Sequence, residues 1–94
     1  MVTAFIRQRV ADYGRWKKAF DDHEQMRRRF GMTSHTVYRD ADDPNVVVVA
    51  GHSLDLTHAR EFIASPDLHT AMHHAGVDGY PEIWITEDVE DKSY

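Results

Sequence analysis

The stretch Asp12–Gly31, DYGRWKKAFDDHEQMRRRFG, carries the clearest pattern in the chain. Large and mostly apolar residues recur in it at spacings of three and four, which aligns them along one side of an α-helix. This stripe comprises Tyr13, Trp16, Ala19, Phe20, His23, Met26, Arg27 and Phe30. Asp12 is a suitable N-cap, and Gly31 suits the position just after a helix C-terminus. The sequence therefore predicts one amphipathic helix between these two residues.

Segments typical of β-strands lie on both sides of this helix. Val2–Val10 precedes it and is rich in β-branched and aromatic residues. Thr33–Asp40 and Val46–Ser53 follow it, joined by the turn-forming residues Asp42–Asn45, which predicts an antiparallel hairpin. The four consecutive valines in the second of these strands favour burial on both faces. Pro81–Asp88 is the fourth predicted strand.

A second helical region lies between Asp55 and Gly76. Asp55 can cap its first helix, and Ser65 with Pro66 predicts a restart, with serine as N-cap and proline at the first helical position. The resulting order is β-α-β-β-α-α-β within one domain of residues 1–94. This order predicts a ferredoxin-like α+β sandwich, in which a four-stranded antiparallel sheet carries both helical regions on one face.

The other face of that sheet would be uncovered in a single chain. The run Val46–Val49, together with Ile83 and Ile85, places apolar side chains on both faces of the sheet. Large exposed apolar patches usually mark interfaces. We therefore expect a homodimer in which two sheets pack face to face.

The composition excludes several kinds of site and partner. The chain has no cysteine, which rules out disulfides, thiolate metal ligands and thiol nucleophiles. A net charge of -5 disfavours nucleic acid as a partner. No apolar run approaches the ~20 residues of a membrane helix, and no signal-peptide pattern is present, so we expect a cytoplasmic protein without a membrane partner. Seven histidines remain as the main candidates for chemistry.

Several segments resemble one known superfamily across nearly the whole chain. They are Val10–Lys17, Phe20–His23 with Arg27, Arg39–Asn45, Ala59–Leu68 and Met72–Val77. Together with the element order they resemble the dimeric α/β-barrel superfamily, which includes antibiotic-biosynthesis-monooxygenase-like proteins and small bacterial proteins labelled "cyclase". The resemblance implies a barrel formed by the sheets of two subunits, with a pocket in each subunit between sheet and helices.

Members of this superfamily include cofactor-free monooxygenases, lactone isomerases and haem-degrading enzymes, so the fold does not determine the function. The haem-degrading members, aligned on Ser65, have an iron-ligating histidine at the position of Met72 and a tryptophan at the position of Phe62. Haem degradation is therefore not expected for this chain.

His23 and Arg27 are the predicted catalytic residues. Both lie in the stripe of the first helix, one turn apart, and burying either without a partner is costly. In the functional interpretation, His23 is a general base and Arg27 steadies an anionic oxygen in the pocket. In the structural interpretation, His23 hydrogen-bonds a strand group and Arg27 pairs with an acid.

Other residues are candidates for substrate binding. The aromatic candidates are Tyr13, Trp16, Phe20, Tyr38 and Trp84, for which plain core packing is the alternative. His35 and His52 lie on the hairpin strands, where the sequence does not decide which face looks into the pocket. The spacing of His69 and His73 would allow both to bind one metal, but no third ligand accompanies them, so they are predicted to be solvated, as are His58 and His74.

The leading hypothesis is a small-molecule enzyme resembling cofactor-independent monooxygenases or cyclases. It would act on an aromatic or polyketide-like substrate through His-assisted proton abstraction, and no cofactor or metal is expected because no phosphate-binding loop, nucleophile elbow or zinc motif is present. One alternative is a non-catalytic small-ligand-binding or stress-response dimer. Another is a transition-metal site built from His23 with His35 or His52.

Overall fold

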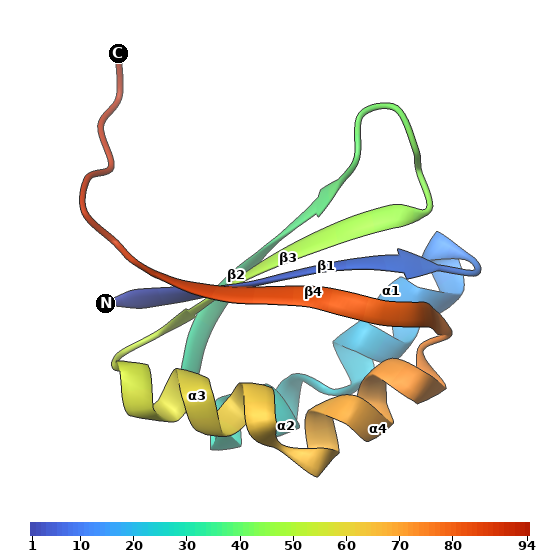
Figure 1. Ribbon diagram of the computed structural model, residues 1–94, viewed down its shortest axis with the longest axis horizontal. Coiled ribbons are helices and arrows are strands. Elements are labelled where there is room, and N and C mark those ends of the chain that lie inside the picture. Colours follow the sequence, from blue (N-terminus) through green and yellow to red (C-terminus); the bar gives the residue numbers. More distant parts are fainter.

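The computed structural model describes all of residues 1–94. The chain forms eight elements of secondary structure (Figure 1). In chain order they are β1 (Val2–Val10), α1 (Tyr13–Asp22), α2 (Glu24–Arg29), β2 (Met32–Arg39), β3 (Val46–Ser53), α3 (Leu56–Ala64), α4 (Pro66–His74) and β4 (Val77–Glu87). Asp12, Asp55 and Ser65 cap α1, α3 and α4, because each side chain accepts a hydrogen bond from a backbone N–H of the first turn.

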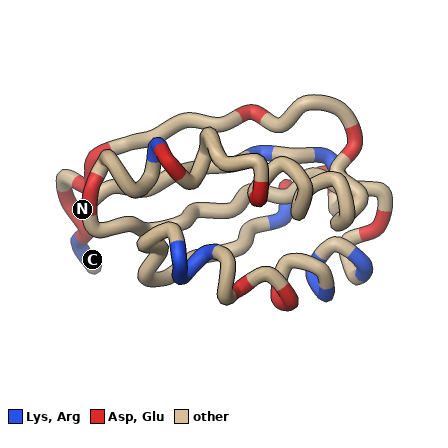
Figure 2. The backbone as a smooth tube through the Cα atoms, turned by 90° about the horizontal axis from the view of Figure 1, so that it is seen from below, with Lys and Arg blue, Asp and Glu red and all other residues tan.

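The sheet has the strand order β2-β3-β1-β4, and every neighbouring pair is antiparallel. All four helices lie on one face of this sheet, and the other face is uncovered (Figure 1). The predicted ferredoxin-like α+β fold is therefore confirmed. Seen from the helical side, acidic and basic residues are interspersed along the chain (Figure 2). None of the four helices has the length and hydrophobicity needed to span a membrane.

The predicted first helix is divided in two at His23, so the observed order is β-α-α-β-β-α-α-β. The backbone N–H of His23 bonds to the carbonyl of Phe20 at 3.2 Å, three residues back, instead of to Ala19. The imidazole Nδ1 of His23 lies 2.6 Å from the Ala19 oxygen and takes its place. The sequence pattern does not reveal this break, because Trp16 before it and Met26 after it are both buried.

The strand β4 begins at Val77, before the predicted start at Pro81, because it passes through a bulge. Arg7 pairs with Glu82 and Arg9 with Asp78, so Gln8 on β1 faces three residues of β4. A proline has no N–H for the regular ladder, and bulges are where strands tolerate it. The strand β2 begins and ends one residue earlier than predicted, whereas β1 and β3 have the predicted bounds.

Pairing across the sheet decides which strand residues face the helices, because directly opposite residues share a face. Ile6 is buried beneath the helices and pairs with Val49, which pairs in turn with Val37. His35 lies two residues from Val37 and therefore shares the helix-facing side. His52 pairs with Thr3 and lies on the uncovered face.

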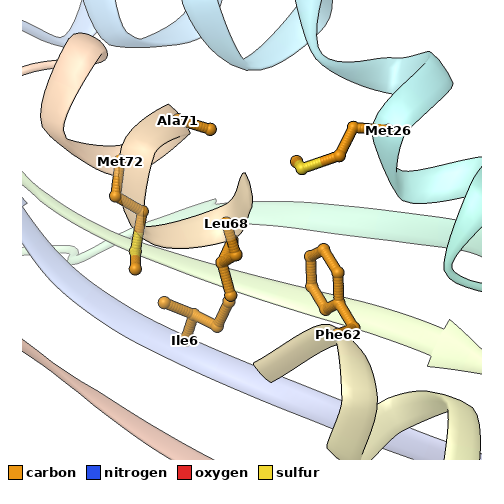
Figure 3. Packing of buried hydrophobic residues seen from close by; sticks show 6 residues of the cluster. All are labelled: Ile6, Met26, Phe62, Leu68, Ala71 and Met72. Atoms are coloured by element: carbon orange, nitrogen blue, oxygen red, sulfur yellow. The ribbon is translucent and has the colours of Figure 1, made fainter. Parts of the chain in front are cut away.

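The core lies between the sheet and the helices in two groups of buried side chains. One group consists of Ile6, Met26, Phe62, Leu68, Ala71 and Met72, which converge from β1, α2, α3 and α4 (Figure 3). The other consists of Val10, Trp16, Val47, Val49 and Ala75. Neither group closes the whole space between the layers, and the candidate site lies there.

Candidate active site

A cavity of about 470 Å³ lies between the sheet and the helices. Ala4, Ile6 and Gly51 contribute to its sheet side, and the helices contribute apolar side chains such as Phe62 and Leu68. A volume of this size is typical of sites for small organic ligands. The cavity is also bordered by His23, Arg27, Trp16, Phe20 and His35. Five of the nine predicted site residues therefore lie together.

His23 is held in one tautomer by the helix that it interrupts. Its Nδ1 lies 2.6 Å from the carbonyl oxygen of Ala19, and a carbonyl can only accept, so this contact places a proton on Nδ1. In the neutral imidazole, Nε2 then carries the free lone pair. No hydrogen bond within the chain uses Nε2. The ring is half-buried and borders the cavity, which gives it the arrangement of a general base.

Arg27 is buried without a carboxylate partner. The residue is 7% exposed, and its Nη1 donates to the carbonyl oxygen of Phe20 at 2.7 Å. Its Nη2 has no hydrogen-bond partner. Burial lowers the pKa of Arg27, while the charges of Glu24 and Asp21 act in the opposite direction from outside salt-bridge distance. A guanidinium stays protonated near neutral pH, so the cavity contains an unpaired positive charge.

Phe20 connects Arg27 to the aromatic residues of the site. The guanidinium carbon of Arg27 lies 3.7 Å from the centre of the Phe20 ring. The indole of Trp16 stacks on the same ring at 4.9 Å, and the imidazole of His35 meets it edge-on at 4.9 Å. Desolvation lowers the pKa of His35, and the positive charges of Arg27 and Lys17 lower it further. His35 is therefore a neutral imidazole at neutral pH.

The four other predicted substrate-binding residues do not border the cavity. Tyr13 packs against Trp16 at 5.9 Å on the far side from Phe20 along α1, under the guanidinium of Arg39. Tyr38, His52 and Trp84 lie on the uncovered face of the sheet, because side chains alternate along each strand. Trp84 stacks there on Phe5, and His52 Nδ1 lies 3.0 Å from the Thr3 hydroxyl. A small molecule that contacts Tyr38, His52 or Trp84 would therefore have to bind on the uncovered face of the sheet, outside the cavity.

Gln8 is a further cavity residue, and it is not among the site residues predicted from the sequence. It lies on β1 between the core residues Ile6 and Val10, is 5% exposed and borders the cavity. Its amide oxygen Oε1 has no hydrogen-bond partner. A signal was present in the sequence: Arg7 and Arg9 mark the other face of β1, so Gln8 is a polar residue at a helix-facing position.

The structure brings together no group of three or more histidine, aspartate or glutamate side chains that could hold a metal ion. His23 and His52 lie on opposite faces of the sheet, so they cannot share a metal within one chain. The remaining histidines, His58, His69, His73 and His74, are exposed as predicted. His58 contacts Asp55, the cap of α3, at 2.7 Å.

No protein-family model matches the sequence, and no functionally curated protein matches it. Solved structures do match the fold. SnoaB from Streptomyces nogalater, a cofactor-independent oxygenase, superposes with a TM-score of 0.75 at 20% identity, over 96% of this chain and 94% of that one. The chain shares the fold of the antibiotic biosynthesis monooxygenases.

Two further structures extend this likeness. A protein from Bordetella bronchiseptica, proposed to be an antibiotic biosynthesis monooxygenase, gives a TM-score of 0.78 at 10% identity, over 95% of this chain and 97% of that one. Rv0793 from Mycobacterium tuberculosis gives 0.70 at 14% identity, over 98% of both chains. The resemblance predicted from the sequence is thus confirmed in the fold, and function has to be argued from the cavity.

Proposed function

We propose that this protein is a small-molecule enzyme whose reaction begins with removal of a proton from an acidic C–H or phenolic O–H group. His23 accepts the proton on Nε2, and Arg27 stabilises the resulting enolate or phenolate oxygen. The observation that carries the proposal is the pairing of these two groups in one cavity. One is an imidazole with a free nitrogen, and the other is a buried guanidinium that no carboxylate neutralises.

The two groups supply complementary parts of such a reaction. A positioned base typically accelerates proton transfer by about 10²–10⁴-fold. A cation placed where negative charge develops stabilises the anion more strongly in a site shielded from water than in bulk solvent. The cost of burying Arg27 without a partner is recovered when an anion forms beside it.

The carbanion formed in this way can react directly with dioxygen, as in a cofactor-independent monooxygenase, or attack a carbonyl of its own chain, as in a cyclase. The first course is supported by the shared fold with SnoaB, a cofactor-independent oxygenase. An aromatic or polyketide-like substrate is supported by the rings of Trp16, Phe20 and Phe62 around the cavity. The proposed reaction uses no cofactor.

Proton abstraction can be tested with dithranol, a tricyclic phenolic ketone with an acidic methylene group. In D2O without oxygen, we expect the protein to accelerate exchange of the methylene protons for deuterium above the uncatalysed rate, measured by proton NMR. Admitting air then separates the two courses, because an oxygenase consumes dioxygen in proportion to the dithranol oxidised. Binding of dithranol with neither exchange nor oxidation would contradict the proposal and favour the non-catalytic ligand-binding alternative.

We also propose that the uncovered face of the sheet forms a homodimer. Tyr38 and Trp84 on that face are 52% and 42% exposed in the single chain, and Phe5 and Val48 lie beside them. An apolar face of this kind would be unusual on a monomer in water. Packing two such faces together buries both aromatic side chains and completes a second covered layer for each sheet.

Trp84→Glu should dissociate this dimer, because the substitution replaces the indole that stacks on Phe5 in the apolar face with a carboxylate. We expect a dissociation constant at least about thirtyfold higher than that of the unmodified protein, the effect of losing an aromatic anchor of the interface. Sedimentation velocity over a concentration series measures it, and Thr70→Glu on the exposed side of α4 is the matched control. A mass of one chain for the unmodified protein would refute the dimer.

A further inference from the structure

The cavity contains a second unsatisfied polar group besides Arg27. Gln8 is 5% exposed, and its Oε1 has no partner among the protein's own groups. Its neighbours on the helix-facing side of the sheet are Ile6, Val10 and the directly opposite Val47, none of which has a polar side chain. The neighbouring side chains of the sheet therefore do not provide the missing hydrogen bond.

A buried amide without a partner is destabilising, and an apolar residue would pack equally well beside Ile6 and Val10. The bulge of β4 opposite Gln8 leaves this residue without a directly paired neighbour on that side. Bulges are frequent beside binding sites, where they alter the direction of side chains. Both features are explained if the partner of Gln8 is part of a ligand.

We propose that Gln8 recognises a hydroxyl group of the substrate, while Arg27 binds an anionic oxygen elsewhere on the same molecule. The substrate class is then an apolar, aromatic molecule that carries a hydroxyl group separate from its enolate, phenolate or carboxylate oxygen. A hydroxyl group suits Gln8 because it both donates and accepts, so it can pair with either end of the amide. This inference rests on the proposed function, since it assumes that the cavity is the substrate site.

Recognition by two separate groups makes a specific prediction for ligand pairs that differ in one hydroxyl. Cinnamate carries only the carboxylate that Arg27 would bind. The ortho, meta and para isomers of coumarate add a hydroxyl at three different distances from it. We expect one isomer to bind about five- to tenfold more tightly than cinnamate, which is the effect of one additional buried hydrogen bond. Isothermal titration calorimetry measures the affinities without any need for turnover.

Replacing Gln8 should remove this discrimination and leave the rest of the site intact. In Gln8→Leu we expect the best coumarate isomer and cinnamate to bind equally well. Gln25→Leu, at an exposed position of α2, is the matched control and should keep the preference. In Arg27→Met both ligands should bind more weakly, while the ratio between them stays. A preference for the hydroxyl that survives in Gln8→Leu would overturn the inference.

A measurement on the unmodified protein guards against a variant that fails to fold. The chain has only three side-chain amides, from Gln8, Gln25 and Asn45, so their NMR signals are readily assigned. The Gln8 amide signals should shift with the preferred coumarate isomer well beyond their shift with cinnamate. Equal shifts, or equal affinities for cinnamate and all three isomers, would overturn the role of Gln8. The dithranol exchange reaction tests the base independently, so the two failures can be told apart.

Discussion

Arg27→Met should make the protein more stable and at the same time impair its binding of anions. The unmodified protein buries the Arg27 guanidinium with one unpaired nitrogen, whereas methionine fills a similar volume without a charge. The lost bond to Phe20 leaves no orphaned carbonyl, because the same oxygen also accepts from the backbone N–H of His23. We expect a gain of about 1 kcal/mol in the free energy of unfolding, or about 4–8 °C in melting temperature for a domain of this size.

The same substitution should lower the affinity for cinnamate by about tenfold to a hundredfold, the usual range for a lost hydrogen bond to a charged group. It should also raise the pKa of His35, since desolvation and the positive charges of Arg27 and Lys17 all lower that pKa and the variant removes the larger of the two charge effects. Histidine NMR signals followed over a pH series report this change. Arg29→Met, on the exposed side of the same helix, is the control and should change none of these quantities.

The pH dependence of stability follows from the direction of the His35 shift. A histidine whose pKa is lower in the folded protein binds its proton more readily in the unfolded chain. Its contribution to stability is therefore present above the ordinary histidine pKa of about 6.5 and is lost as the pH falls below it. In Arg27→Met this loss of stability at low pH should be smaller.

If Arg27→Met lost several kcal/mol of stability and still bound cinnamate normally, Arg27 would have a structural role instead of a role in anion binding.

The order of strands and helical regions, and the bounds of β1 and β3, could be predicted because local signals agree with each other. Asp55, Ser65 and Pro66 mark helix starts, and Asp42–Asn45 marks a tight turn, so the fold follows from short stretches of sequence. The break at His23 could not be predicted in this way. The spacing of three and four residues continues across the break, so the pattern looks like one helix. The contact between His23 and the Ala19 carbonyl, which interrupts the helix, forms only in the folded chain and leaves no mark in the spacing.

The residues of the site were predictable on the helix and not on the hairpin. Helical phase alone places Trp16, Phe20, His23 and Arg27 towards the sheet. The sequence of β3 does not show which of its residues face the helices, because four consecutive valines fit both faces of a sheet equally well. His35 and His52 were therefore equivalent in the sequence and lie on opposite faces in the structure. Only the pairing with β1, where Arg7 and Arg9 mark the outer face, separates them.

Substitution of His23 should have the largest effect on the proposed reaction. Without the imidazole, we expect the rate of dithranol deuterium exchange to fall by about 10²–10⁴-fold, the usual contribution of a general base. His23→Ala tests this, although the substitution also frees the Ala19 carbonyl to accept from the backbone N–H of residue 23. The helices α1 and α2 would then join into one helix, and Arg27 on α2 would change position. His23→Ala would therefore both remove the base and displace Arg27.

His23→Asn separates the two effects, because the amide nitrogen of asparagine takes the position of the histidine Nδ1. Its side-chain amide can still donate to the Ala19 carbonyl and keep the helix interrupted, but it cannot accept a proton near neutral pH. We expect this variant to lose exchange as completely as His23→Ala while binding cinnamate like the unmodified protein. Free imidazole in the buffer should restore part of the activity of His23→Ala, since it can enter the space left by the ring. His69→Ala, on the exposed side of α4, should exchange at the normal rate. If His23→Asn retained full exchange, the base would have to be another group of the cavity. His35, whose lowered pKa keeps it neutral at neutral pH, would be the residue to replace next.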